Sequence, residues 1–107
     1  MSIQPGETLE KDPDAILVYE FDWTDWLGDT AQIVTSTFAI SGGDTAAPPG
    51  TVLTKDNAVI VSGGKKTQIR LLNGTKGKKY EITNHIVTNE VPAQEDDRSF
   101  FVKMVEQ

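Results

Sequence analysis

Short β-prone runs separated by turn signals are the feature that most limits what this chain can fold into. The runs are rich in Val, Ile, Thr and aromatic residues, and glycine, proline or asparagine stands between them. None has the 3.6-residue periodicity of a long helix. The predicted strands cover residues 16–22, 32–40, 51–54, 58–61, 67–72, 79–88 and 98–106. About seven short strands at this spacing predict an all-β fold, an immunoglobulin-like antiparallel β-sandwich.

Side-chain alternation within the strands predicts which residues face the core. Residues 79–88 alternate most cleanly and place Tyr80 on the more apolar face. The alternation in residues 32–40 changes parity, which a β-bulge near residues 34–36 would explain. Residues 55–57, Lys-Asp-Asn, predict a tight turn between two short strands.

The length of 107 residues fits one domain and is too short for two independent cores. Residues 1–14 carry two prolines and four acids with little apolar content, so we expect an extended N-terminal arm. Residues 15–107 then form the single β-sandwich domain. An arm of this kind can order on a neighbouring protein and act as a tether, which makes Asp12 and Asp14 candidate contact residues.

The residue inventory argues against an enzyme. The chain has no cysteine and one histidine, which excludes thiolate catalysis, cysteine zinc sites and two-histidine metal sites. That histidine, His85, lies on the face opposite Tyr80 and is expected at the surface. Phosphate-binding and dinucleotide-binding glycine motifs are missing. We therefore predict no catalytic residues, no metal and no cofactor.

The charge distribution points to protein partners. A net charge of −6 argues against nucleic acid as a partner, and no apolar run approaches the roughly 20 residues of a membrane span. Residues 1–53 hold nine acids and one base, whereas residues 54–107 hold seven acids and nine bases, giving −8 and +2. This asymmetry would let identical copies attract one another head to tail around a ring. The candidate basic contacts are Lys65, Lys66, Lys78 and Lys79.

The acidic first half also raises a calcium hypothesis, because carboxylate oxygens are the ligands that calcium prefers. The carboxylates concerned are Asp12, Asp14, Asp22, Asp25 and Asp29. Their spacing fits no EF-hand loop, so solvated loop carboxylates are the main alternative.

The segment after the first predicted strand combines two tryptophans with a turn signal. Asp22 or Thr24 could cap a single helical turn that Gly28 ends, placing Trp23 and Trp26 three residues apart on one side. We assign Trp23 to the core. For Trp26, covering a loop and meeting a partner both remain open, since tryptophan dominates interface hot spots.

Tyr80 stands just after a glycine-containing turn, at the place where sandwich folds put a tyrosine whose hydroxyl bonds back to the preceding corner. An ordinary core tyrosine is the alternative. Either role is structural.

Several stretches together resemble a known family. The stretches are KDPDAILVYEFDWTDWLGD, IVTSTFAI, YEITNHIVTNE and DDRSFFVKMV, and the similarity covers most of residues 11–105. They are similar to small proteins from tailed-phage structural clusters that are described as phage fibre-tail adaptor proteins. The most specific parts are Lys-Asp-Pro-Asp at 11–14, Asp22-Trp23 with Trp26-Leu27, and Arg-Ser-Phe at 98–100.

The resemblance implies an immunoglobulin-like, non-enzymatic virion protein that joins or decorates the tail or neck. Its partners would be other virion proteins and copies of itself in a symmetric assembly, with no nucleic acid and no membrane. It would be assembled in the bacterial host cytoplasm. Capsid decoration and binding of carbohydrate or the host surface remain alternatives, with Trp26 as the residue that stacks on a sugar. The family pattern retains both Asp22 and Arg98, which suggests a structural pair linking the first and last predicted strands.

Overall fold

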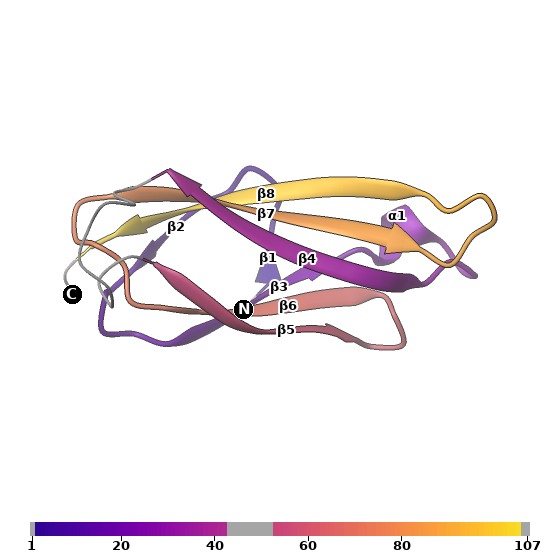
Figure 1. Cartoon of the computed structure of the whole chain (residues 1–107), viewed down its shortest axis with the longest axis horizontal. Coiled ribbons are helices and arrows are strands. Elements are labelled where there is room, and N and C mark those ends of the chain that lie inside the picture. Colours follow the sequence, from indigo (N-terminus) through magenta and orange to yellow (C-terminus); the bar gives the residue numbers. More distant parts are fainter. Residues whose placement is uncertain (1, 43–52, 106–107) are drawn as a thin grey trace.

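Two four-stranded β-sheets pack face to face in the computed structural model, which describes residues 2–42 and 53–105 (Figure 1). The first sheet has the strand order β1-β3-β6-β5 and the second has the order β2-β8-β7-β4. The strands are β1 (Ser2–Ile3), β2 (Thr8–Lys11), β3 (Leu17–Asp22), β4 (Ile33–Gly42), β5 (Thr54–Val61), β6 (Lys66–Leu72), β7 (Lys79–Thr88) and β8 (Glu95–Met104). The predicted all-β sandwich is confirmed.

The core lies between the sheets and follows the alternation of the strands. Along β7 every second residue from Tyr80 to Thr88 is buried, and Phe100 and Val102 of β8 lie opposite them. From the first sheet, Tyr19 and Phe21 place their rings 5.5 Å from the ring of Phe100. This aromatic cluster joins the two sheets at their centre.

The edge strands β4 and β5 each contain one irregularity in their pairing with the neighbouring strand. The pairing of β4 with β7 shifts register between Ile33 and Thr35, which confirms the predicted bulge. The predicted tight turn at residues 55–57 is wrong, because β5 is continuous and its pairing with β6 shifts between Asp56 and Val59. Asn57 has a φ of 50°, so the residue that signalled a turn instead supports a bulge within one strand. Residues 51, 52 and 106 of the predicted strands lie outside the described residues.

The N-terminal segment is part of both sheets, so the prediction of an arm outside the sandwich is wrong for residues 2–11. β1 pairs in parallel with β3, and β2 pairs in parallel with β8. Between them the Gly6 N–H donates to the Ser99 carbonyl at 2.8 Å, and Ile3 is buried. These strands are too short to show a clear alternation, which is why the acids and prolines dominated the prediction.

Lys11 shows how a charged residue ends β2 inside the sandwich. Its side chain is buried, and Nζ donates to the carbonyl oxygens of Asp12 at 3.0 Å and Asn73 at 2.9 Å. Burial lowers the pKa of Lys11, while the nearby carboxylates of Asp12 and Asp14 oppose that effect. The hydrogen bonds replace the water that the ammonium group loses on burial.

Within residues 2–42 and 53–105, no helix is long and apolar enough to cross a membrane.

Candidate functional site

A short helical turn, α1 (Thr24–Leu27), follows β3 at one end of the sandwich; Trp26 lies in the turn and Trp23 immediately precedes it. The Asp22 carboxylate accepts hydrogen bonds from the Thr24 hydroxyl at 2.5 Å and from the Thr24 N–H at 2.9 Å. These two hydrogen bonds lower the pKa of Asp22. Gly28, with a φ of 74°, ends the turn in a conformation that side chains rarely adopt.

Trp23 is fully buried and holds the exposed Trp26 in place. The Trp23 indole Nε1 donates to the Thr67 hydroxyl at 3.1 Å, and its main-chain N–H donates to the Lys65 carbonyl. The Trp26 ring meets the Trp23 ring edge-on, with 5.6 Å between centroids and 72° between planes. Trp26 remains 36% exposed, so the turn presents one indole to solvent while that indole packs against the buried Trp23 ring.

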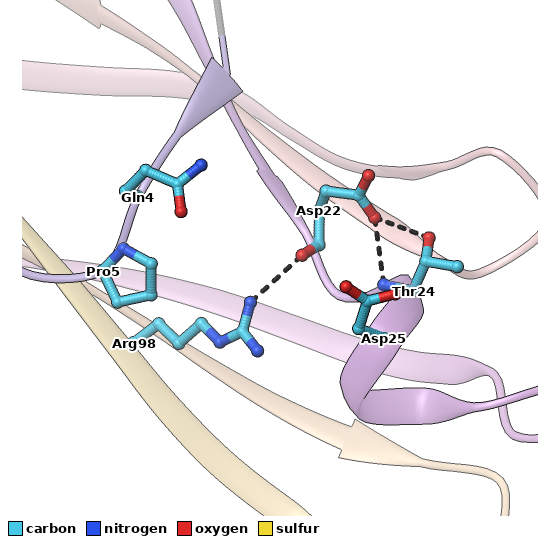
Figure 2. A pocket seen from close by; sticks show the side chains of 6 residues that line it. All are labelled: Gln4, Pro5, Asp22, Thr24, Asp25 and Arg98. Carbon is cyan, nitrogen blue, oxygen red and sulfur yellow. Dashed lines mark hydrogen bonds between the residues drawn. The ribbon is translucent and has the colours of Figure 1, made fainter.

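Arg98 of β8 lies over the same buried ring, with its guanidinium carbon 4.1 Å from the Trp23 centroid. Its NH1 donates to the main-chain carbonyl of Asp22 at 3.0 Å (Figure 2). The side-chain partner of Arg98 is therefore the Trp23 ring, and its hydrogen bond reaches Asp22 through the main chain. This contact joins β8 of the second sheet to the end of β3 in the first.

A pocket of about 350 Å³ opens beside Arg98. It lies between the turn that joins β1 to β2, the end of β3, the start of α1, and β8 (Figure 2). Its walls offer one guanidinium, two carboxylates, an amide and a hydroxyl. The lining residues are Gln4, Pro5, Asp22, Thr24, Asp25 and Arg98. We call these six residues together with Trp26 the α1 surface, and their chemistry suits hydrogen bonding to a polar partner beside an apolar anchor.

Buried hydrogen bonds connect Trp23 to the opposite sheet. The Thr67 hydroxyl that accepts from Trp23 donates to the Asn84 side-chain oxygen at 2.6 Å. The Asn84 amide nitrogen donates to the Ser36 hydroxyl at 2.9 Å and to the Thr37 carbonyl at 3.0 Å. Sequence reasoning missed Thr67. The available signal was Asn84, a polar residue on the buried face of the most regular strand.

The candidate basic contacts do not form one surface. Lys65 is engaged by the loop after α1, where Nζ donates to the carbonyls of Gly28 at 2.8 Å and Ala31 at 2.5 Å. Lys66 pairs with Glu20 at 3.7 Å. Lys65 and Lys66 lie at the start of β6, and the length of that strand separates them from Lys78 and Lys79.

Lys78 and Lys79 lie after β6, at the opposite end of that strand. Lys78 is exposed, and the Lys79 ammonium lies 4.8 Å from the centroid of the Phe101 ring. The run of bases in the sequence is thus split between the two ends of the sandwich. This split removes the basis for a single basic patch that attracts a second copy head to tail.

The five candidate calcium ligands are also divided. Asp12 and Asp14 precede β3, and the Asp12 carboxylate accepts from the Asp14 N–H at 2.8 Å. Asp22, Asp25 and Asp29 follow at the other end of that strand. In the part of the chain that the structure describes, no three His, Cys, Asp or Glu residues form a group that could hold a metal ion. The prediction that all five could gather at one site is wrong.

His85 lies on the outer face of the second sheet between two carboxylates of β8. Its Nδ1 is 2.5 Å from the Asp97 carboxylate and its Nε2 is 2.9 Å from that of Glu95. These hydrogen bonds, that of Asp97 first, raise the pKa of His85. The side chain is 42% exposed, so solvent screens the interaction.

Tyr80 is buried at the start of β7, and its hydroxyl accepts from the Thr75 N–H at 3.0 Å. This is the return to the preceding corner that its position led us to expect.

Comparison with known families decides where the chain belongs. Residues 11–103 match the family described as podophage GP4 fiber-tail adaptor protein gp77. The chain belongs to this fibre-tail adaptor family. Membership supports a structural role in the phage tail, as part of the virion and in contact with other tail or fibre proteins. No curated protein matches the adaptor closely enough to be counted as a relative.

Proposed function

We propose that the chain is a non-enzymatic structural protein that joins a fibre to the tail or neck of a tailed phage. The observation that carries this proposal is the family match across residues 11–103. Membership in a fibre-tail adaptor family favours this role over capsid decoration.

The α1 surface is the contact that we assign to the fibre or tail partner. Trp26 supplies a large side chain whose orientation is fixed by Trp23, so little conformational entropy is lost when a partner covers it. Arg98, Asp25 and Gln4 of the pocket supply charged and polar groups, and Arg98 contacts the same Trp23 ring as Trp26. An apolar anchor with a polar margin is the usual anatomy of a protein interface.

Replacement of Trp26 tests this assignment in assembled particles. Trp26→Ala removes the exposed indole while Trp23 remains hydrogen-bonded to Thr67, so we expect a folded protein and particles that carry fewer fibres. Val59→Ala removes an exposed apolar side chain on β5 and is the matched control. Fibre content is measured by quantitative mass spectrometry and by counting fibres in cryo-EM images. A full complement of fibres on Trp26→Ala particles would rule out Trp26 as the fibre contact.

The composition of the α1 surface supports a second candidate, which is carbohydrate binding. Arg98, Asp22, Asp25 and Gln4 can bond to sugar hydroxyls, and an indole can stack on a sugar ring. Titration with oligosaccharides from the host surface should then change tryptophan fluorescence, and Trp26→Ala should abolish the change. An unaltered spectrum across the series would remove this candidate.

We also infer that several copies act together, because the fibres of a symmetric tail require repeated attachment points. The lysines of the predicted basic patch lie at two different ends of the sandwich. Contact between copies therefore needs a surface other than the one predicted for head-to-tail association.

A further inference from the structure

The main-chain groups of β4 provide a surface through which two copies could associate. The strand pairing shows which of these groups point outward. The Met104 N–H donates to the Lys78 carbonyl and the Thr88 N–H to the Gln94 carbonyl, so even-numbered residues of β7 bond to β8. Odd-numbered residues of β7 therefore bond to β4, as the bond from the Asn89 N–H to the Gln32 carbonyl also indicates.

The register of β4 with β7 then fixes the orientation of β4 itself. Thr37 pairs with His85 and Ala39 with Thr83, so these odd-numbered residues bond to β7. The N–H and C=O groups of the even-numbered residues point away from the sheet. They belong to Ser36, Phe38, Ile40 and Gly42, and within residues 2–42 and 53–105 they have no main-chain partner on that side.

This edge lacks the protection found on the other outer strands. Beyond its bulge, β4 carries no charged residue and no proline, whereas β5 carries Lys55, Asp56 and an irregularity. On β8, the stretch that β2 leaves uncovered is acidic, and the Asp96 carboxylate accepts from the Asp97 N–H. Natural proteins guard free edges by such means because an unguarded edge pairs with other strands.

We propose that β4 pairs antiparallel with β4 of a second copy about a two-fold axis at Phe38. Ser36 of one copy then lies opposite Ile40 of the other, and Thr37 lies opposite Ala39. The joint sheet has four strands from each copy. This interface deepens the self-association proposed above by naming its surface and its symmetry.

A second copy is the occupant because this edge is complementary to itself. Thr35, Thr37, Ala39 and Ser41 form the exposed row of β4, and all are neutral and small. Two identical charged edges would repel each other, whereas two copies of this row can meet without like-charge contacts. A two-fold contact uses the same patch on both copies and closes on itself.

The shape of the sandwich limits the contact to the second half of β4. The Ile33 N–H donates to the Gly64 carbonyl, so the connection between β5 and β6 covers the beginning of the strand. Figure 1 shows β4 diverging from β5 toward its C-terminal end. With the axis at Phe38, the paired residues are therefore 36–40 of each copy.

An interface of one short strand from each copy should be weak. It buries less than the roughly 1,600 Å² of a standard stable interface, so we expect a dissociation constant above about 1 µM in solution. Copies held close together on one particle would pair more completely, because tethering raises their effective concentration.

Cysteine cross-linking tests the register directly, because the native chain has no cysteine. Thr37 and Ala39 of the second copy would form a pair without mutual hydrogen bonds, the closer type of cross-strand pair. A mixture of Thr37→Cys and Ala39→Cys proteins should therefore form a disulfide-linked dimer under mild oxidation. Each variant alone should not, since its cysteines lie diagonally apart.

A mixture of Thr8→Cys and Ala39→Cys is the control for random collision, because Thr8 is exposed on the far edge of the same sheet. If the mixture of Thr37→Cys and Ala39→Cys gives no more dimer than this control, the proposed register is wrong.

Sedimentation equilibrium tests the edge without covalent trapping. The native chain should dimerise with increasing concentration, and Thr37→Lys/Ala39→Lys should remain monomeric because four lysines would meet across the axis. Thr8→Lys/Val59→Lys adds the same charge elsewhere and should still dimerise. A native chain that stays monomeric up to about 1 mM, well above the range expected for one strand pair, would overturn the proposal.

The same assay separates this proposal from the assignment of the α1 surface. Trp26→Ala lies on a different surface and should dimerise like the native chain. Loss of fibres in that variant with intact dimerisation supports both assignments, and loss of dimerisation in Trp26→Ala contradicts the β4 interface.

Discussion

Two buried tyrosines differ in what their hydroxyl groups contact. The Tyr80 hydroxyl accepts from the Thr75 N–H, whereas the Tyr19 hydroxyl has no hydrogen-bond partner among the described residues. Burial raises the pKa of Tyr19 to about 12, so this hydroxyl stays neutral at physiological pH. A buried hydroxyl that loses its hydrogen bonds to water without replacing them opposes folding.

Removing each hydroxyl should therefore have opposite consequences. Tyr19→Phe should leave the free energy of unfolding unchanged or raise it, because no hydrogen bond is lost. Tyr80→Phe should lower it by about 1 kcal/mol, the usual contribution of one hydrogen bond. Urea denaturation of the two variants measures the difference, and equal destabilisation by both would contradict it.

His85 gives the fold a defined pH dependence. Its pKa is raised in the folded state by Asp97 and Glu95, so the folded chain holds the proton more tightly than the unfolded chain. The resulting stabilisation is complete below the unfolded pKa of about 6.5 and is lost as the pH rises through the folded value.

Relative to His85→Gln, the native chain should accordingly gain stability between pH 8 and pH 6. Thermal unfolding of both proteins across this range measures the change. The effect is small because the side chain is partly exposed. A difference between the two proteins that does not vary with pH would exclude the ion pairs as its source.

At the level of elements, the first two strands close both sheets on the same side of the sandwich. Deleting residues 2–11 would remove the buried Ile3 and expose the main-chain edges of β3 and β8. We expect the truncated chain to unfold at a much lower temperature or to aggregate, because free edges invite strand pairing. Circular dichroism and light scattering measure both effects. A truncated chain that melts like the native protein would mean that β1 and β2 contribute nothing to stability.

The sequence predicts well those elements whose alternation is long enough to read. The side-chain alternation over the ten residues of β7 correctly predicted which face is buried. The change in alternation within β4 correctly predicted the position of its bulge. Asn57 adopts a positive φ, but that conformation fits a tight turn and a bulge equally. The two residues of β1 and the four of β2 are too few to show an alternation of side chains. Their charged neighbours therefore led to the prediction of an arm in place of two strands.

The candidate site was only partly predictable, because its contacts depend on tertiary packing. Asp22, Trp23 and Trp26 are close in sequence, and their turn was expected from local rules. The position of Arg98 over Trp23 depends on β8 lying beside the end of β3, which no local pattern specifies. The predicted basic patch was wrong for the same reason, because Lys65 and Lys66 lie at one end of β6 whereas Lys78 and Lys79 follow its other end.

At the scale of the whole molecule, one chain of buried hydrogen bonds fixes how the sheets face each other. It runs from Trp23 through Thr67 of the first sheet to Asn84 and Ser36 of the second. Because each member satisfies a neighbour, removing one leaves other buried polar groups without partners.

Asn84→Ala should therefore cost more than the loss of one hydrogen bond. It leaves the Thr67 hydroxyl without its acceptor, the Ser36 hydroxyl without this donor and the Thr37 carbonyl without its side-chain donor, and we expect a loss of about 2–4 kcal/mol. Thr83→Ala is the matched control, because it removes one half-buried hydroxyl contact to Ser99 on the same strand. Chemical denaturation compares them, and similar losses in both variants would show that the buried chain is not cooperative.

The parallel pairing of β2 with β8 has a mechanical consequence. These strands lie near opposite ends of the sequence, so tension between the two termini would pull them in opposite directions along their own length. In that geometry the hydrogen bonds between them share the load and must break together, whereas strands pulled sideways separate one bond at a time. Resistance to force depends on the rate of unfolding and not on equilibrium stability alone. A domain built this way can transmit a steady pull along its axis before it gives way.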